Sequence, residues 1–178
     1  MISDCMVWIQ FLFSCLKARK ILDISMPIVS ISELKACLKP NQCLLGIDLG
    51  SKTIGMAISD TSLIVASPLD TLKRARIKDD SAKLLTLIKD RYVGGLVLGL
   101  PLNMNGREGP RCQATRQFAR NLLTVFEHPI AFWDERLSTK AVERVLIDEA
   151  DMTRKRRGEV VDKIAAAYIL QGALDIRI

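Results

Sequence analysis

The sequence predicts an α/β domain with a mixed β-sheet covered by helices on both faces, and three observations support this fold class. Three short apolar segments follow one another between residues 44 and 72, which favours an antiparallel meander. Two later apolar segments, 94–101 and 129–133, alternate with helical patterns, as parallel strands joined by crossover helices do. The length of 178 residues suits one such domain.

The amino-terminal half is predicted to hold a short helix and then the meander. Residues 31–38 predict the helix, with Ser32 as the candidate cap. Three strands follow, each an apolar run bounded by turn residues: 44–50, 54–60 and 64–72. Pro68 lies in the third strand and marks a sheet edge or a bulge, because proline has no N–H for the ladder.

The carboxyl-terminal half is predicted to alternate between helix and strand. From Asp80 the apolar spacing becomes helical, and Asp80 or Ser81 is the candidate cap. The elements expected after this helix are strand 94–101, loop 102–110, a helix around 115–126, strand 129–133, a helix after Ser138 or Thr139, loop 153–158 and a helix from about 159 to 175.

The amino terminus differs from the rest of the chain. Its apolar stretch, Cys5–Leu16, follows Asp4 and precedes basic residues, which is the reverse of the charge order in a secretory signal. Two interpretations are open: the stretch is a peripheral amphipathic anchor, or synthesis begins at Met26. In both, the chain divides into an atypical extension at 1–25, a short leader helix at 26–42 and the main domain at 43–178.

Composition excludes several kinds of site. The only histidine is His128, so a zinc site with several imidazoles is impossible. The five cysteines form no C-x-x-C pair, which excludes a zinc ribbon and argues against a disulfide framework. No apolar run reaches the roughly 18 residues of a membrane span. We therefore expect a cytoplasmic protein with reduced thiols and no membrane partner.

Acidic residues in apolar surroundings suggest the chemistry. Asp48 lies within a predicted buried strand, where an unpaired carboxylate costs several kcal/mol. Asp134 and Glu135 end another apolar strand, and Asp162 lies in the last helix beside the small residues Ala165 and Ala166. Carboxylates without histidine or thiolate partners suit Mg²⁺ or Mn²⁺. Two such ions can activate a water and stabilise the leaving oxygen in phosphodiester cleavage.

Each acid also has a structural explanation. Asp162 can favour an early helical turn through the helix dipole, and Asp134 can form a salt bridge with Arg136. Asp48 is the hardest to explain by structure alone. Because neighbouring residues of a strand face opposite ways, Asp134 and Glu135 are not both expected to be ligands unless the strand has already ended.

The net charge of +6 is unevenly distributed. Two groups of basic residues are Lys73, Arg74, Arg76 and Lys78, and Arg154, Lys155, Arg156 and Arg157. Such clusters suit a nucleic-acid backbone, although two solvated loops are the more common explanation of such clusters when they are taken alone.

Four motifs together resemble the YqgF family, whose members are described as pre-16S rRNA nucleases or Holliday junction resolvases. The resemblance covers about residues 43–175, in the order G-I-D-L-G-S-K-T-I-G at 46–55, V-L-G-L-P-L-N-M-N-G-R-E-G-P at 97–110, D-E-R-L-S-T at 134–139 and V-D-K-I-A-A-A-Y-I-L-Q at 161–171. It implies an RNase H-like fold, a five-stranded mixed sheet whose first three strands are antiparallel, and metal-dependent phosphodiester hydrolysis.

The resemblance also assigns roles to residues. It implies Asp48, Glu135 and Asp162 as catalytic metal ligands, with Asp134 as a further catalytic acid. It implies a basic loop at 154–157. The residues expected to bind nucleic acid are Lys52, Arg107, Arg136, Arg154, Lys155, Arg156 and Arg157.

Alternatives differ in substrate and in class. The expected substrate is structured pre-16S rRNA, cleaved at its 5′ end in ribosome biogenesis; the first alternative is a resolvase acting on branched DNA. A resolvase should act as a symmetric dimer, and the sequence allows a monomer or a homodimer. A module that binds nucleic acid without cutting is the second alternative. Residues 46–60 also resemble a phosphate-binding hairpin of actin-like ATPases, but those proteins need two such domains.

Overall fold

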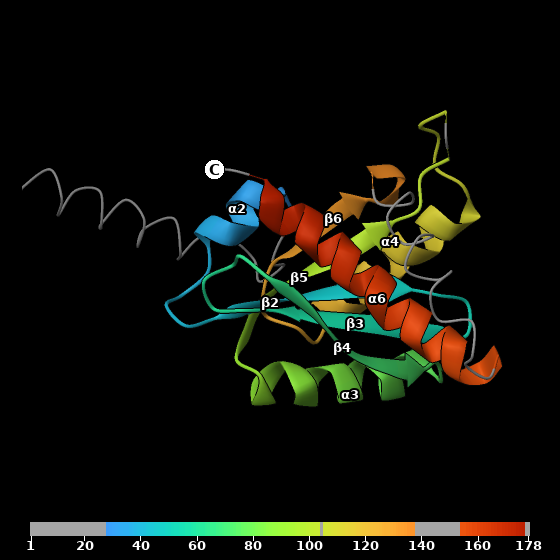
Figure 1. Cartoon of the computed structure of the whole chain (residues 1–178), viewed down its shortest axis with the longest axis horizontal. Helices are drawn as coiled ribbons and strands as arrows, with labels where there is room; N and C mark the ends of the chain where they lie inside the picture. Colours follow the sequence, from blue (N-terminus) through green and yellow to red (C-terminus); the bar gives the residue numbers. More distant parts are fainter. Residues whose placement is uncertain (1–27, 104, 138–153, 177–178) are drawn as a thin grey trace, which may run out of the picture.

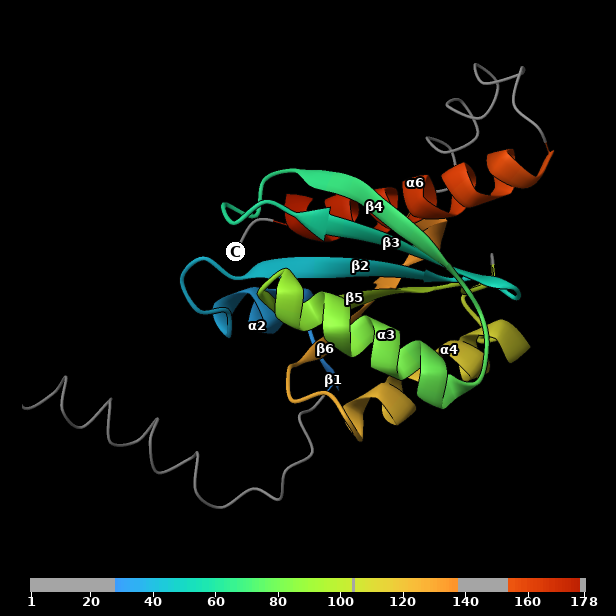
Figure 2. The same ribbon diagram turned by 90° about the horizontal axis from the view of Figure 1, so that it is seen from below.

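The computed structural model describes residues 28–103, 105–137 and 154–176, and it confirms the predicted α/β class. A mixed sheet lies between two helical layers. Figure 2 shows α3 (Ile77–Asp90) and α4 (Pro110–Leu123) on one face and α6 (Arg154–Asp175) on the other. The predicted extension at 1–25 and the helix expected after Ser138 or Thr139 lie outside the described residues.

The sheet has six strands in the order β1-β6-β5-β2-β3-β4. The strands are β1 (Ile28–Val29), β2 (Cys43–Leu49), β3 (Thr53–Ser59), β4 (Ala66–Lys73), β5 (Val93–Leu100) and β6 (Ile130–Asp134). β2, β3 and β4 pair antiparallel, whereas β5 is parallel to both β2 and β6. This is the topology that the resemblance implies for its five strands.

The expected count of five strands is wrong by one. β1 pairs in parallel with β6, with Ile28 opposite Ile130. A two-residue strand is too short to show a period in the sequence, so only its pairing with β6 reveals it. It extends the sheet by residues that were expected to belong to a helical leader.

β4 forms one edge of the sheet, as Pro68 predicts. The register between β3 and β4 shifts between Met56 and Ala57, and Ala57 is the partner of Pro68. Gln171 of α6 fixes the turn that precedes this strand. Its side-chain carbonyl accepts from the backbone N–H of Ala66 at 2.8 Å, and its amide donates to the carbonyl of Ile64 at 3.0 Å.

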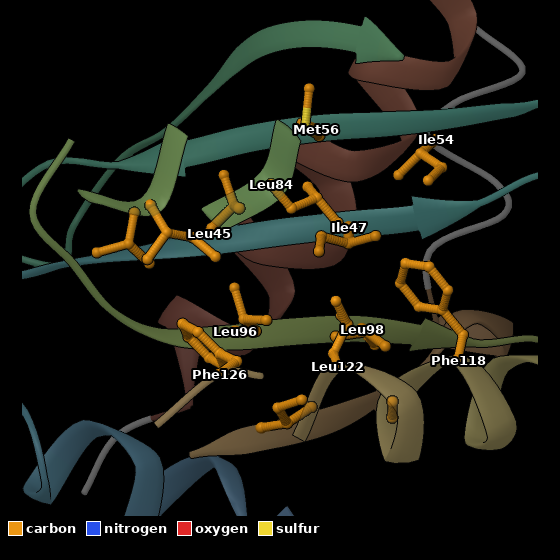
Figure 3. Close-up of a cluster of buried hydrophobic side chains, with 14 of the residues drawn as sticks. Leu45, Ile47, Ile54, Met56, Leu84, Leu96, Leu98, Phe118, Leu122 and Phe126 are labelled. Carbon is orange, nitrogen blue, oxygen red and sulfur yellow. The ribbon is translucent and has the colours of Figure 1, made fainter. Parts of the chain in front are cut away.

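The two faces of the sheet carry side chains of different size. The face beneath α3 and α4 is filled by large side chains, with Leu84 and Phe118 among those that the helices contribute. Figure 3 shows this cluster between the strands and the helices. The face beneath α6 is lined by smaller residues such as Ala57 and Val97, and Ala166 of α6 is fully buried against it. Smaller side chains allow α6 to lie close to the strands.

The leader helix α2 (Ile31–Ala36) packs into the α6 layer. Ile31 and Leu34 are buried with residues of α6. Lys35 donates from Nζ to the carbonyls of Leu174 and Ile176, at 2.8 and 2.7 Å. A cation at this position satisfies orphan carbonyls at the carboxyl end of a helix.

Two predicted helix caps are wrong. Ser30, not Ser32, caps α2: it accepts from the N–H of Glu33, whose carboxylate accepts the N–H of Ser30 in return. α3 begins at Ile77, ahead of the expected cap Asp80. Asp80 is instead buried within the helix and accepts from the N–H of Ala75 at 3.0 Å, so its carboxylate holds the chain that enters the helix.

The predicted loop at 153–158 is also wrong in its described part, because α6 already begins at Arg154. Arginine and lysine are good helix formers, so they extend the helix rather than interrupt it. In Figure 1 the resulting 22-residue helix lies across the strands. Among the residues that the structure describes, no helix is both long and apolar enough to cross a membrane.

Candidate active site

The predicted acids lie at one end of the sheet, here called the sheet edge, where the carboxyl termini of most strands meet. β2, β4, β5 and β6 all run toward this edge, because β3 is antiparallel to both β2 and β4. Asp48 lies one residue before the end of β2, and Glu135 immediately follows β6. The carboxyl ends of strands are the usual position of sites in α/β sheets.

Glycines beside Asp48 make room for the last helix. Gly55 of β3 is the cross-strand partner of Asp48. A Cβ at Gly55 would overlap the backbone carbonyl of Asp162 in α6. Gly46 makes a similar approach, since its Cβ would lie 2.9 Å from the carbonyl oxygen of Ala166. These glycines therefore allow α6 to bring Asp162 to the strand pair that carries Asp48.

Glu135 reaches the same region from the other side of β2. Gly99 follows Leu98, the parallel partner of Ile47, so it lies beside Asp48 in the sheet. A Cβ at Gly99 would overlap the carboxylate oxygen Oε1 of Glu135. The absence of a side chain at Gly99 thus leaves the space that the Glu135 carboxylate occupies.

Asp134 and Glu135 have different surroundings because the strand ends between them. Asp134 is the last residue of β6, and Glu135 opens a single 3₁₀ turn that ends at Leu137. Asp134 accepts two hydrogen bonds from Nε of Arg136, at 3.0 and 2.9 Å, and one from its N–H at 3.0 Å. These hydrogen bonds lower the pKa of Asp134. The structural alternative for Asp134, a salt bridge with Arg136, is therefore present.

The electrostatics of Asp48 and Glu135 show that the acids influence one another. Burial and then the charge of Asp162 raise the pKa of Asp48 to about 6, although Arg111 acts in the opposite direction. Burial and then the charge of Asp48 raise the pKa of Glu135 to about 7, again opposed by Arg111. A cation bound among these carboxylates would relieve the part of each pKa increase that comes from like-charge repulsion.

The raised pKa values predict a stability that falls as pH rises. Asp48 and Glu135 titrate near 3.8 and 4.5 in the unfolded chain but near 6 and 7 in the folded protein. The folded state therefore binds more protons than the unfolded chain between these pKa values. As a result, the free energy of unfolding that these two groups contribute is fully present below about pH 4 and is lost by about pH 7. The shift of Asp48 corresponds to at most about 3 kcal/mol, and solvent screening reduces the contribution of Glu135, which is less buried.

Urea unfolding at pH 4, 5.5 and 7 measures this effect. The double variant Asp48→Asn/Glu135→Gln removes both titrations, and contributions of other carboxylates cancel in the difference from the parent protein. We expect the variant to gain stability relative to the parent as pH rises. A difference that stays constant across this range would contradict the assigned electrostatics.

Arg111 is a residue of the site that sequence analysis missed. It lies in the first turn of α4, which begins with Pro110. The next residue, Cys112, donates from Sγ to the carbonyl of Pro101 at 2.8 Å, which holds the start of the helix against the end of β5. Arg111 is the cation that lowers the pKa of both Asp48 and Glu135. The run G-P-R just after a glycine-bearing loop was the available signal.

The donor set fits a hard cation in type. Asp48, Glu135 and Asp162 supply only carboxylate oxygens, the ligands preferred by Mg²⁺ and Mn²⁺. Within the described part of the chain, no group of three or more His, Cys, Asp or Glu side chains is already arranged to hold a metal ion.

Three of the basic residues expected to bind nucleic acid, Lys52, Arg107 and Arg136, lie at the same end of the strands as the acids. Lys52 is exposed in the turn between β2 and β3, and Arg107 is exposed in the loop after β5. Arg136 follows Glu135, and its Nη1 would lie 3.5 Å from a Cβ at Gly106 of that loop. The backbone of Arg154, Lys155, Arg156 and Arg157 forms the first turns of α6, and their side chains lie outside the described part of the structure.

Solved structures that resemble this chain include a RuvC complex with a Holliday junction substrate and a yeast resolvase. RuvC from Thermus thermophilus, in complex with a Holliday junction substrate, matches with a TM-score of 0.48 and 16% identity, over 72% of this chain and 91% of that chain. The yeast mitochondrial Holliday junction resolvase matches with a TM-score of 0.44 and 12% identity, over 79% of this chain and 83% of that chain.

Sequence relatives are much closer. A protein of Paramagnetospirillum magneticum, named "Putative pre-16S rRNA nuclease", is 59% identical over 152 residues, which cover 85% of this chain and 97% of the relative. A protein of Phenylobacterium zucineum with the same name is 56% identical over 151 residues, covering 84% and 97%. The family model described as "RuvX: Holliday junction resolvase" matches residues 42–176. The chain therefore belongs to the RuvX Holliday junction resolvase family, which confirms the resemblance seen in its four motifs.

Proposed function

We propose that this protein is a nuclease that hydrolyses phosphodiester bonds of pre-16S rRNA at its 5′ end during ribosome biogenesis, in the cytoplasm. Relatives more than 50% identical bear the name of this activity. The observation that carries the proposal is the meeting of three acids from separate elements at one edge of the sheet. Asp48, Glu135 and Asp162 come from β2, the turn after β6, and α6.

The buried carboxylates of Asp48 and Glu135 are energetically unfavourable, which supports a catalytic role for them. Burial raises the pKa of Asp48 and of Glu135, and each is raised further by a neighbouring carboxylate. A protein that only binds phosphate gains nothing from buried negative charge, because like charges repel the ligand. The acids therefore favour a nuclease over a module that binds without cutting.

We propose that Asp48, Glu135 and Asp162 hold Mg²⁺ or Mn²⁺. When bound, such ions supply an activated water and stabilise the charge on the leaving oxygen. Asp134 orients Arg136 through their paired hydrogen bonds. Together with Lys52, Arg107 and the basic start of α6, Arg136 would hold the phosphate backbone.

A cleavage assay with the whole protein tests both substrate and metal. The substrates are a 5′-extended pre-16S rRNA fragment and a four-way DNA junction, each with Mg²⁺, Mn²⁺ or EDTA. We expect cutting of the RNA with either ion and none in EDTA. Equal cutting in EDTA would refute the metal-dependent mechanism.

The second candidate function is Holliday junction resolution, which the family's description favours. A resolvase must cut two strands symmetrically and so should act as a dimer. Symmetric junction cutting by a dimer, measured with sedimentation of the same sample, would select this function. Binding of RNA without any cutting would instead indicate a binding module.

A further inference from the structure

A second basic surface lies at the same end of the strands as the acids, next to the end of β4. It consists of Lys73, Arg74, Arg76 and Lys78, here called the β4-end cluster, and all four residues are exposed. Lys73 is the last residue of β4, and Arg76 and Lys78 flank the first residue of α3. The cluster adjoins Lys52 but shares no residue with the basic residues placed around the acids above.

Hydrogen bonds hold Arg74 of this cluster to the turn that follows the strand carrying Asp48. The N–H of Arg74 donates to the carbonyl of Lys52 at 2.9 Å, and its Nη1 donates to the carbonyl of Gly50 at 3.0 Å. Gly50 lies two residues beyond Asp48. Since β4 is separated from β2 only by β3, the two strands lie about 10 Å apart.

The cations of this cluster remain available to a ligand. Across residues 28–103, 105–137 and 154–176, the ion pairs join Arg116 to Glu108 and Arg136 to Asp134. None of the four cluster residues has a carboxylate partner there. Two acids lie nearby: Asp80 is buried and accepts the N–H of Ala75, whereas Asp79 is exposed next to Lys78 and forms no ion pair among the described residues. Arg74 donates one of its five guanidinium N–H groups to Gly50, so its other N–H groups can donate to a phosphate.

We propose that the β4-end cluster binds the phosphate backbone of the nucleic-acid substrate on one side of the cleavage point, while Arg107 and Arg136 bind it on the other. The substrate strand would then run along the carboxyl-terminal ends of the sheet strands, from β4 to β6, and would pass over the acids. A row of cations that flanks acids on both sides fits a polyanion better than a small anion. The inference rests on the proposed nuclease function and adds the path of its substrate.

Salt-dependent binding tests this path without any need for cleavage. The protein carries Asp48→Asn, the buffer contains EDTA, and the probe is a fluorescent 5′-extended pre-16S rRNA fragment. The test variant adds Lys73→Gln, Arg74→Gln and Arg76→Gln. Each lost phosphate contact should lower the slope of log K against log[salt] by about 0.7 for a single strand or about 0.9 for a duplex. We expect at least two contacts to be lost and binding in 50 mM salt to weaken by about tenfold or more.

A charge-matched variant separates a specific path from general attraction. Lys83→Gln, Lys89→Gln and Arg91→Gln remove the same charge from exposed positions along α3 and just beyond its end. This variant should keep the parent slope. A fourth protein, with Lys73→Gln and Arg76→Gln only, retains the Arg74 bond to Gly50 and should still lose about one contact or more.

Failure of this inference is distinguishable from failure of the proposed function. If the Asp48→Asn protein binds the RNA with equal slope in the test and charge-matched variants, the path along β4 is wrong and the nuclease proposal stands. Absence of salt-dependent RNA binding in every variant would overturn both. A reduced slope only in the cluster variants would support the path.

Discussion

Replacement of Asp48 by asparagine should abolish cleavage while the fold and nucleic-acid binding persist. Asparagine has nearly the same shape but lacks the charge that a divalent ion requires. Loss of metal-based charge stabilisation worth several kcal/mol corresponds to a rate reduction of about a thousandfold or more. Single-turnover cleavage of the RNA fragment measures the rate, and fluorescence anisotropy measures binding.

The electrostatics predict that this variant is at least as stable as the parent at pH 7. Burial and Asp162 disfavour the ionised form of Asp48, so a neutral side chain removes an unfavourable charge. Asp90→Asn is the matched control, because Asp90 is exposed at the end of α3, away from the acids. Full activity in Asp48→Asn would remove Asp48 from the catalytic site.

Replacement of Gly55 by alanine should destabilise the protein strongly. The added Cβ would overlap the backbone carbonyl of Asp162, and a backbone atom inside a helix cannot turn aside as a flexible side chain can. Overpacking of this kind costs about 1–3 kcal/mol and occasionally more, and the backbone clash places this variant at the upper end. The expected decrease in Tm is about 6–12 °C.

Thermal unfolding followed by circular dichroism measures this change. Gly109→Ala is the control, because its Cβ would meet Asn103 only at ordinary contact distance, 3.4 Å or more. Gly109 has an extended backbone that alanine adopts, so this change should cost less than about 1 kcal/mol. Equal Tm values for the two variants would show that α6 does not press on β3 at Gly55.

Much of the fold follows from local patterns in the sequence. The strands β2, β3 and β5 are apolar runs with clear boundaries, and each lies within about a residue of its predicted place. The edge position of β4 follows from Pro68, which has no N–H to donate. Helix starts were less predictable, since Ser30 and Ser32 are both plausible caps and the choice depends on which turn packs Ile31 and Leu34 into the core.

The candidate site was predictable only in part. Asp48 was identifiable because a carboxylate inside an apolar strand needs a reason. The different surroundings of Asp134 and Glu135 depend on where β6 ends, which the sequence left open. The only local signal for Arg111 was the G-P-R run, which does not show that this residue acts on Asp48 and Glu135, two acids far from it in the chain.

The sequence by itself determined the fold class, the family and the acidic residues, since these depend on local hydrophobic patterns and on motifs. The tertiary structure alone decided how those acids meet. Ala165 and Ala166 suggested a close helix, yet the approach depends on Gly46 and Gly55 on the facing strands. Gly46 and Gly55 matter because they have no side chain, and the sequence alone does not show that α6 packs into the space this leaves.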